Sequence, residues 1–505
     1  MNRPADPTIL PGRPRPRSVA AALVVVALLG LGACAHEMSA GRIDPGAPPE
    51  PARPWTPPAD LPPPSRTEAP PPPVPPDLIE TMDRWTLPDL VDLALRNSPA
   101  TRESWARARA AAAELGGEKG SRYPTIDGQV NAVRARGAAV GGQFIYEATS
   151  TDPFIQLEWL LLDFGGRKAA IDAARQALIA ADYAHNAAIQ DVVLQVEEAT
   201  HQYLYARALE ESERAAVREA EAGLDAAEQR REAGVATIAD VLQARTRLSQ
   251  AQLALQTVQG QTRTVRGALA TAVGLPANTE FDVPPPSGDL PLDEAAVAVE
   301  RAIDEAQERR PELARARAEV ERAEADLREQ KAAFRPRLTA STNAGRIYYG
   351  PFASNADTYT ASLLLTIPIY SGGTRRYNVF RAEAERDAAV AQLGALSQQI
   401  TLEVWTAYYD HQTAIQQVRS SADLVDSARQ SHEVAAARYR SGVGTILDLL
   451  TAQQALESAR AQEASARAAW SISLARFAHA TGGLWRSAPA PDRRLATDAT
   501  LEDQP

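Results

Sequence analysis

Apolar side chains in two long segments of this chain recur at alternating spacings of three and four residues. The segments run from 165 to about 231 and from 373 to about 440, and neither contains a proline. This spacing is that of a helical heptad, and about 67 residues at 1.5 Å each make a helix of about 100 Å. Shorter returning helices are predicted at roughly 237–273 and 445–481. The seam positions are Ile189, Val192, Val196, Ala199, Tyr203 and Ala206 in the first segment, and Ile400, Val404, Ala407, His411 and Ala414 in the second.

Four other segments read as β-strands. Between 358 and 370 apolar residues occupy one face and threonine and serine most of the other, a period of two typical of a strand. Residues 155–161 alternate similarly, and weaker strands precede these two at 123–134 and 336–346. Each strand has about ten residues, close to the length that crosses a bilayer when tilted. The residues predicted to face lipid on the clearest strand are Tyr359, Leu363, Leu365 and Ile367.

These elements belong to a duplication, because the chain repeats its motifs about 210 residues apart. Pro99 is matched by Pro311, and Gly165-Gly166 is matched by Gly372-Gly373. The separations are 212 and 207 residues. A repeat of this length predicts one body built from two similar halves rather than a short solenoid.

The N-terminal residues are predicted to be a targeting signal rather than part of the fold. Arg13, Arg15 and Arg17 form a basic region before an apolar stretch from Val19 to Leu31, which suits a signal peptide and is too short for a transmembrane helix. The stretch ends at Leu31-Gly32-Ala33-Cys34, which resembles a bacterial lipobox. The chain is therefore predicted to be cleaved before Cys34, the single cysteine, and Cys34 to be acylated; an ordinary signal peptide is the alternative. Ala35 after it points to the outer membrane.

Sixteen of the 37 prolines lie between Pro45 and Pro76. Proline fixes φ and removes a donor, so this segment is predicted to be a semi-rigid tether; a proline-rich ligand is the alternative. The predicted division of the chain follows from these changes of composition. It comprises a lipoprotein signal peptide at 1–33, a tether at 34–80, a first repeat at 81–274, a linker at 275–294, a second repeat at 295–484 and a C-terminal tail at 485–505.

The strands limit how such a chain could enter a membrane. The mature sequence has no run of 18 apolar residues, so no helix is predicted to span lipid. Strands cross lipid only as a closed barrel, and four are too few to close one. Either at least two chains pool their strands, or the strands form two hairpins packed on a soluble helical body.

The order of these motifs resembles that of the TolC-like outer-membrane efflux proteins, in particular their lipoprotein branch. The resemblance covers roughly 85–485, and its clearest motifs are 365–373, at the strand-to-helix junction, and 437–445, at the turn into the returning helix. It implies a mainly α fold with a small membrane β-barrel: a homotrimer that pools twelve strands and continues as a helical tunnel. It also implies an equatorial domain, built partly from 265–300 and from the segment after 482.

Asp240 and Asp448 occupy matching positions in the first turns of the returning helices. Thr237 and Thr445 precede them by three residues, which is the capping-box pattern. The resemblance implies a second role, in which acids at these positions hold a narrow periplasmic mouth closed. In the second copy, Thr451 stands where the family often carries a further acid, so the constriction is expected to be less acidic.

The glycine turns before those acids are the predicted docking tips. Gly234-Val235 and Gly442-Val443 match the place where family members meet a periplasmic adaptor protein. Glycine is also a common helix terminator, so the residues by themselves establish only a turn.

The predicted function is the exit duct of a tripartite efflux or secretion system, anchored by lipid in the outer membrane of a Gram-negative bacterium. Its partners would be the adaptor and an inner-membrane pump. No catalytic, metal-binding or cofactor motif accompanies the helices, and a net charge of −11 disfavours nucleic acid. The alternative is a periplasmic coiled-coil adaptor or scaffold lipoprotein without a channel.

Overall fold

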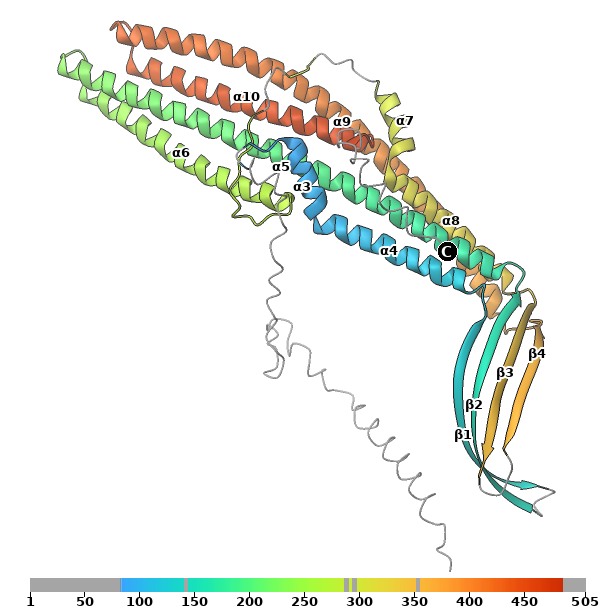
Figure 1. The fold of residues 1–505 in the computed structure, drawn as a ribbon. Coiled ribbons are helices and arrows are strands. Elements are labelled where there is room, and N and C mark those ends of the chain that lie inside the picture. The colour runs from blue at the N-terminus through green and yellow to red at the C-terminus, as the bar shows by residue number, and fades with distance from the viewer. Residues whose placement is uncertain are drawn as a thin grey trace, which may run out of the picture. The chain divides into compact units, whose positions relative to one another are not determined.

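The structure is a computed structural model, and it describes residues 82, 84–139, 144–285, 290–292, 298–350 and 355–484. The segments predicted as signal peptide, tether and C-terminal tail, including Cys34, lie outside these residues. The first half of the fold contains α3 (Leu87–Asn97), α4 (Pro99–Gly120), β1 (Thr125–Ala139), β2 (Phe144–Leu162), α5 (Gly166–Glu232) and α6 (Ile238–Ala272) (Figure 1). The second half contains α7 (Val299–Arg309), α8 (Pro311–Ala332), β3 (Arg337–Tyr349), β4 (Ala356–Thr366), α9 (Thr374–Arg440) and α10 (Ile446–Ala480).

The predicted duplication is confirmed element by element. Corresponding helices have equal lengths: 11 residues in α3 and α7, 22 in α4 and α8, 67 in α5 and α9, and 35 in α6 and α10. Before the strands, matching elements begin 212 residues apart, and after them 208 residues apart. The second pair of strands with its loops is therefore four residues shorter than the first, whereas the helices have not changed in length.

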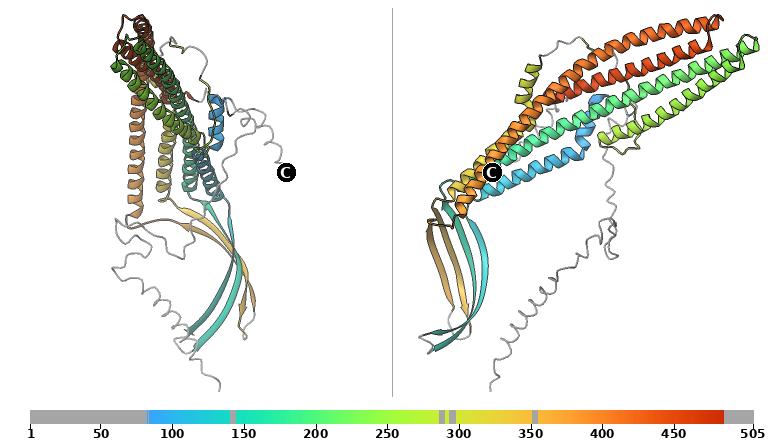
Figure 2. Two further views of the ribbon diagram at one scale, coloured as in Figure 1. Left: turned by 90° about the vertical axis from the view of Figure 1, so that its left-hand side faces the viewer. Right: turned by 180° about the vertical axis from the view of Figure 1, so that it is seen from behind.

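The four strands form one antiparallel sheet in the order β1-β2-β3-β4. The two hairpins are joined through β2 and β3, so the alternative of two separate hairpins packed on a helical body is wrong. Figure 2 shows the sheet continuing from the ends of α4, α5, α8 and α9, away from the turns that end the two long hairpins. The strands have 15, 19, 13 and 11 residues, so β1, β2 and β3 are clearly longer than the predicted length of about ten.

The ends of two predicted strands differ in the structure. β4 ends at Thr366, so Ile367 lies beyond it, because Pro368 has no N–H with which to continue the ladder. Ile367 nevertheless stays exposed. Near the end of β2, the pairing with β3 shifts between Leu160 and Leu162. Leu161, the last apolar residue of the alternating segment predicted at 155–161, therefore falls in a bulge and leaves the apolar face.

The junction between strand and long helix corrects the alignment of the two glycine pairs. Gly165 caps α5 and Gly373 caps α9, both with positive φ (102° and 86°). The structural equivalents thus lie 208 residues apart, and Gly372 (φ 63°) corresponds to Phe164 (φ 54°). A left-handed backbone costs a residue with a Cβ about 1 kcal/mol or more, which explains the glycine in the second copy.

The long helices pack through narrow seams of small and branched residues. α5 packs against α4, α6, α8 and α10, and α9 packs against α7, α8 and α10. Val192, Val196 and Tyr203 of the predicted seam are buried on α5, as are Ile400 and Val404 on α9. Ala199, Ala407 and His411 are only partly buried, because a helix in a single-layered wall meets its neighbours at its sides and leaves its other faces open.

The linker between the repeats packs on the middle of the helices. Phe281 stacks on Trp85, with ring centroids 5.1 Å apart, and both join a core cluster with Tyr203. Further along, Leu290 and Leu292 lie against α9 and α10. No helix within the described ranges is both long and apolar enough to span a membrane.

Candidate functional site

The register of the sheet places apolar residues from all four strands on one face. Directly paired residues of antiparallel strands share a face, so Ile126, Leu157, Thr342 and Ala361 form one row across the sheet. Alternate rows on the same face add Gly128, Ile155, Ala344, Tyr359, Trp159, Ala340, Leu363, Leu162, Leu338 and Leu365. The strand residues predicted to face lipid, apart from Ile367, thus lie on this face.

No described helix covers this apolar face. Tyr359 is 86% exposed, Leu363 71% and Leu365 55%, and Ile126 and Ile155 are exposed as well. A contiguous apolar surface of this kind marks a site for a membrane or a partner rather than for water.

The opposite face of the sheet is polar and hydrogen-bonded from strand to strand. Ser341 and Ser362 share a hydrogen bond of 2.7 Å between their hydroxyls, and the Gln129 amide donates to Gln156 at 3.3 Å. The two outer strands, β1 and β4, pair on one side only. The sheet therefore has one apolar face, one polar face and two open edges.

The far ends of the two long hairpins are turns of matching geometry. Gly234 and Gly442 adopt left-handed backbones (φ 77° and 83°), which a residue with a Cβ adopts only under strain. Both turns are closed by hydrogen bonds from the next valine, Val235 N–H to the Arg230 carbonyl at 2.9 Å and Val443 N–H to the Arg438 carbonyl at 3.1 Å. The valine side chains are 63% and 70% exposed, so each turn presents an apolar residue to its surroundings.

Asp240 and Asp448 form the predicted capping boxes. The Thr237 N–H donates to the Asp240 carboxylate at 2.8 Å, and the Asp240 N–H donates to the Thr237 hydroxyl at 3.3 Å. At Thr445 and Asp448 both distances are 3.1 Å. The capping role is therefore confirmed, whereas the gate role inferred from the resemblance stays a prediction.

The capping bonds also set the acidity of Asp448. The N–H and hydroxyl of Thr445 stabilise its carboxylate, and Arg438 adds a favourable charge, so the pKa of Asp448 lies below its usual value. Asp448 is exposed, and Asp240 is partly buried on the matching hairpin.

A direct link between the two hairpins lies beside these acids. Arg230, near the end of α5, donates a hydrogen bond to the Tyr439 carbonyl of α9 at 2.5 Å. Its guanidinium also lies 4.7 Å from the centroid of the Tyr439 ring. Burial raises the pKa of Tyr439, the charge of Arg230 opposes this shift and Asp240 adds to it, so both charges act on the Tyr439 hydroxyl. Tyr439 lies within the motif at 437–445, but nothing in that motif predicts the contact with Arg230.

Polar pairs tie the two hairpins together further along α5 and α10. Glu198 binds Arg476 at 2.6 Å and Glu219 binds Arg460 at 3.2 Å. Arg247 of α6 also pairs with Glu457 of α10. These contacts join the first repeat to the second over much of the hairpin length.

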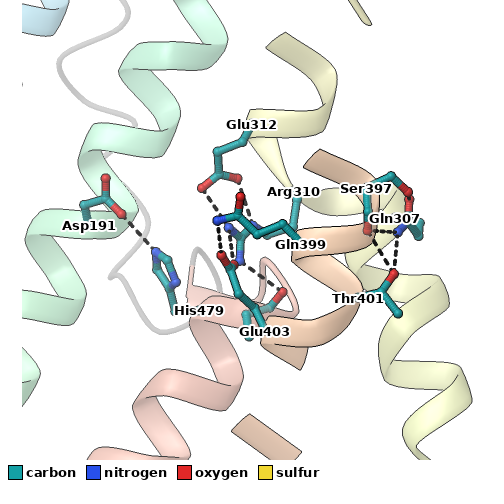
Figure 3. Close-up of polar contacts among 10 residues, drawn as sticks. Asp191, Gln307, Arg310, Glu312, Ser397, Gln399, Thr401, Glu403 and His479 are labelled. Atoms are coloured by element: carbon teal, nitrogen blue, oxygen red, sulfur yellow. Dashed lines mark hydrogen bonds and ion pairs between the residues drawn. The ribbon is translucent and has the colours of Figure 1, made fainter. Parts of the chain in front are cut away.

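Near the middle of the molecule, Arg310 is buried among acids. It stands between α7 and α8, with 6% of its side chain exposed, and binds Glu312 at 2.8 Å and Glu403 at 3.1 Å (Figure 3). The matching residue of the first repeat is Ser98, which caps α4 with its hydroxyl. Arg310 forms no such cap and instead connects α8 to α9, with a further bond to the Ala480 carbonyl of α10. Figure 3 also shows Asp191 of α5 with His479 of α10, 3.0 Å apart.

Across the described ranges, no group of three or more His, Cys, Asp or Glu side chains is placed to hold a metal ion. The features that stand out are the two-faced sheet and the paired helical tips. They belong to opposite ends of α5 and α9.

Comparison with known proteins points to one family. The model of the family "Outer membrane efflux protein" matches residues 90–275 and 302–483. Protein CyaE of Bordetella pertussis is 28% identical over 417 residues, covering 76% of this chain and 81% of CyaE. Outer membrane protein OprJ of Pseudomonas aeruginosa is 27% identical over 373 residues, covering 72% of this chain and 77% of OprJ.

Solved structures show the same fold. A membrane protein from Pseudomonas aeruginosa superimposes with a TM-score of 0.71 at 27% identity, covering 78% of this chain and 93% of its own. The outer membrane protein VceC of Vibrio cholerae gives a TM-score of 0.69 at 23% identity, covering 79% and 96%.

Proposed function

The chain belongs to the outer membrane efflux protein family, and we propose that it forms the outer-membrane exit duct of a tripartite efflux or secretion system. The observation that carries the proposal is the sheet, with an exposed apolar face on one side and hydrogen-bonded polar rows on the other. A wall that separates hydrocarbon from a water-filled passage needs these two faces.

The duct is proposed to be a homotrimer. A sheet in lipid cannot keep open edges, because each unpaired N–H or C=O in hydrocarbon costs several kcal/mol. Four strands are too few to close a barrel, whereas three copies supply twelve. β4 of one copy would pair with β1 of the next, with the apolar faces toward lipid and the helices continuing the passage into the periplasm.

The helical tips are proposed to be the gate and the adaptor-docking end. Three copies would bring three Asp240 and three Asp448 carboxylates around one axis, and such rings favour cations. Gly234-Val235 and Gly442-Val443 would meet the adaptor, because the turns are exposed and carry apolar side chains. The adaptor would in turn connect the duct to an inner-membrane pump.

The proposed anchor is an acyl group on Cys34, which places the chain as a lipoprotein of the Gram-negative outer membrane. Mass spectrometry of the mature N-terminal peptide should show a lipid adduct on Cys34. Cys34→Ala should weaken anchoring without preventing insertion of the sheet, since the sheet has its own apolar face. A mature peptide that begins elsewhere and carries no adduct would contradict the anchor.

Reconstitution tests the duct itself. The purified protein in planar bilayers should give single-channel currents, and in unheated detergent samples it should migrate as a trimer that becomes a monomer after heating. A periplasmic scaffold lipoprotein would bind to bilayers without conducting ions. A monomeric, non-conducting protein would therefore rule out the duct.

A further inference from the structure

A cavity of about 520 Å³ lies where the sheet gives way to the helices, between the start of α5 and the end of α8. Four basic side chains line it, together with one acid, Asp172. The basic residues are Lys168, Arg328, Lys331 and Arg335.

Two of these four basic side chains have no ion pair among the described residues. Lys168 and Arg335 have no carboxylate within ion-pair distance among the described residues, and Arg335 donates instead to the Phe164 carbonyl at 3.1 Å. Asp172 is engaged by Arg175 at 3.2 Å, and Arg328 lies 4.0 Å from its partner Glu324. Of the four, Lys331 has the closest ion pair, 3.3 Å to Glu383. The cavity thus suits an anion.

The basic cavity opens on one side of the helical wall, and a second cavity opens on the other. The second is lined by α4, by alanines of α5, and by Arg315, Glu319 and Arg322 of α8. Glu319 and Arg328 are nine residues apart on α8, about 180° around a helix that turns 100° per residue. On α5, Lys168 and Ala177, from the two cavities, are nine residues and about 180° apart. The two cavities therefore lie on opposite faces of the wall.

The second cavity shares its side of the wall with the polar face of the sheet. Glu329 follows Arg322 by seven residues and so lies on the same side of α8. The charge of Arg337 acts on the Glu329 carboxylate. Arg337 pairs with Thr366 in the rows that contain Ser341 and Ser362, which are polar-face rows. The basic cavity consequently lies on the side of the apolar face.

Exposed aromatic side chains surround the same junction. Trp159 and Phe164 flank the end of β2, Phe334 precedes β3, and Tyr370 and Tyr377 flank the start of α9; all five are exposed. Belts of exposed aromatic residues mark the headgroup level of membrane proteins. The basic cavity therefore lies beside the predicted level of the periplasmic lipid headgroups.

We propose that this cavity binds the phosphate of an anionic phospholipid headgroup in the periplasmic leaflet of the outer membrane. The inference rests on the proposed function, because it requires the apolar face to contact lipid. Lys168 and Arg335 supply the uncompensated charge, and Arg328 and Lys331 surround it. Such a lipid would hold α5 and α8, and hence the two repeats, together at the membrane surface.

The test compares lipid retention by native mass spectrometry of the protein released from detergent. The protein is equilibrated with phosphatidylglycerol, with zwitterionic phosphatidylethanolamine, or with inorganic phosphate. The variant Lys168→Gln/Arg328→Gln removes two cavity charges while keeping the Arg335 bond to Phe164. The matched control, Arg315→Gln/Arg322→Gln, removes two charges from the other side of the wall.

The wild-type protein and the control should retain phosphatidylglycerol in preference to phosphatidylethanolamine, and the cavity variant should retain about tenfold less. Equal retention by all three proteins overturns the proposal, as does binding of free phosphate without any preference for the lipid. Bilayer conductance of the same wild-type preparation separates the two hypotheses. A conducting protein without lipid preference contradicts this site alone, whereas a non-conducting protein contradicts the duct.

Discussion

Arg230 of the first repeat holds Tyr439 of the second in two ways, by a 2.5 Å hydrogen bond to its carbonyl and by stacking 4.7 Å over its ring. Tyr439 is 3% exposed and packs with Ile446 and Leu449 of α10 and Ala226 of α5. The pair therefore fixes the position of one hairpin tip against the other within a single chain. Any widening of the tips that separates α5 from α9 has to break it.

Arg230→Gln should loosen the tips. The change removes the cation–π contact and the charged donor, together about 1 kcal/mol or slightly more at a partly buried site. We expect single-channel recordings to show a higher open probability, by about fivefold in the ratio of open to closed states. Arg231→Gln is the matched control, because Arg231 is exposed and adjacent. Identical recordings from both variants would show that the link does not hold the tips closed.

The double variant Asp240→Asn/Asp448→Asn separates capping from gating. An amide keeps much of the local hydrogen bonding at a cap, so helix stability should change little. In a trimer, however, the change removes three charges from each ring, so conductance should rise and cation selectivity should fall. The expected effect is modest, because Thr451 leaves the second copy without a further acid. If conductance and selectivity equal those of the wild type, the gate role is excluded and only the capping role remains.

Charges placed on the exposed tip residues should block docking. Val235→Asp and Val443→Asp leave the turn glycines in place and put a carboxylate on the proposed adaptor surface. Efflux in a knockout strain should fall strongly while the trimer still assembles, since the turns lie at the far ends of the hairpins. Gly442→Ala serves as the control for backbone strain, because it strains the left-handed turn by about 1 kcal/mol without adding charge. Efflux equal to the wild type in both aspartate variants would exclude the tips as the docking site.

Arg310→Met should destabilise the second repeat. Removing the buried cation leaves Glu312 and Glu403 without their partner, and a fully buried pair would cost 3–5 kcal/mol by this change. Because both carboxylates are partly exposed, we expect about 2 kcal/mol and a lower melting temperature. The control Arg309→Met removes an exposed ion pair with Glu305 and should change the melting temperature little. If the melting curve of Arg310→Met equals that of the wild type, the ion pairs of Arg310 with Glu312 and Glu403 contribute no net stability.

The start of α10 should depend on pH through Asp448. Its pKa is lowered in the folded chain, so its stabilising contribution is present above the usual aspartate pKa. That contribution is lost as the pH falls through the lowered folded value. Hydrogen exchange of the first turn of α10 should therefore quicken at acid pH in the wild type. In Asp448→Asn, exchange corrected for its intrinsic pH dependence should not change over that range.

Much of the fold could be predicted because a long helix repeats its apolar spacing over many turns. The seam positions on α5 and α9 gave both helices to within about one residue, and the threonine–aspartate spacing gave both capping boxes. The strand ends were less certain. Pro368 ends β4 before Ile367, and the bulge after Leu160 moves Leu161 out of its row; these are local effects that alternation alone does not record.

The contacts between repeats could not be predicted in the same way. Arg230 and Tyr439 are 209 residues apart, and no periodic pattern connects an arginine on one helix to a carbonyl on another. Arg310 left a weak signal, because it replaces the capping serine of the first repeat at the matching position. A comparison of the two copies, residue by residue, would have singled it out.

The equal lengths of the paired helices keep the two hairpin turns at the same distance from the sheet. Both halves start from one sheet and end in matching turns, so α5 and α9 each measure the same span with 67 residues. A single deletion in one of them would set its turn about 1.5 Å short and rotate every later residue by about 100°. The four-residue difference between the copies is confined to the stretch from the start of the first strand to the start of the long helix. The strand hairpins are therefore the part of the chain that can change in length without displacing one helical turn relative to the other.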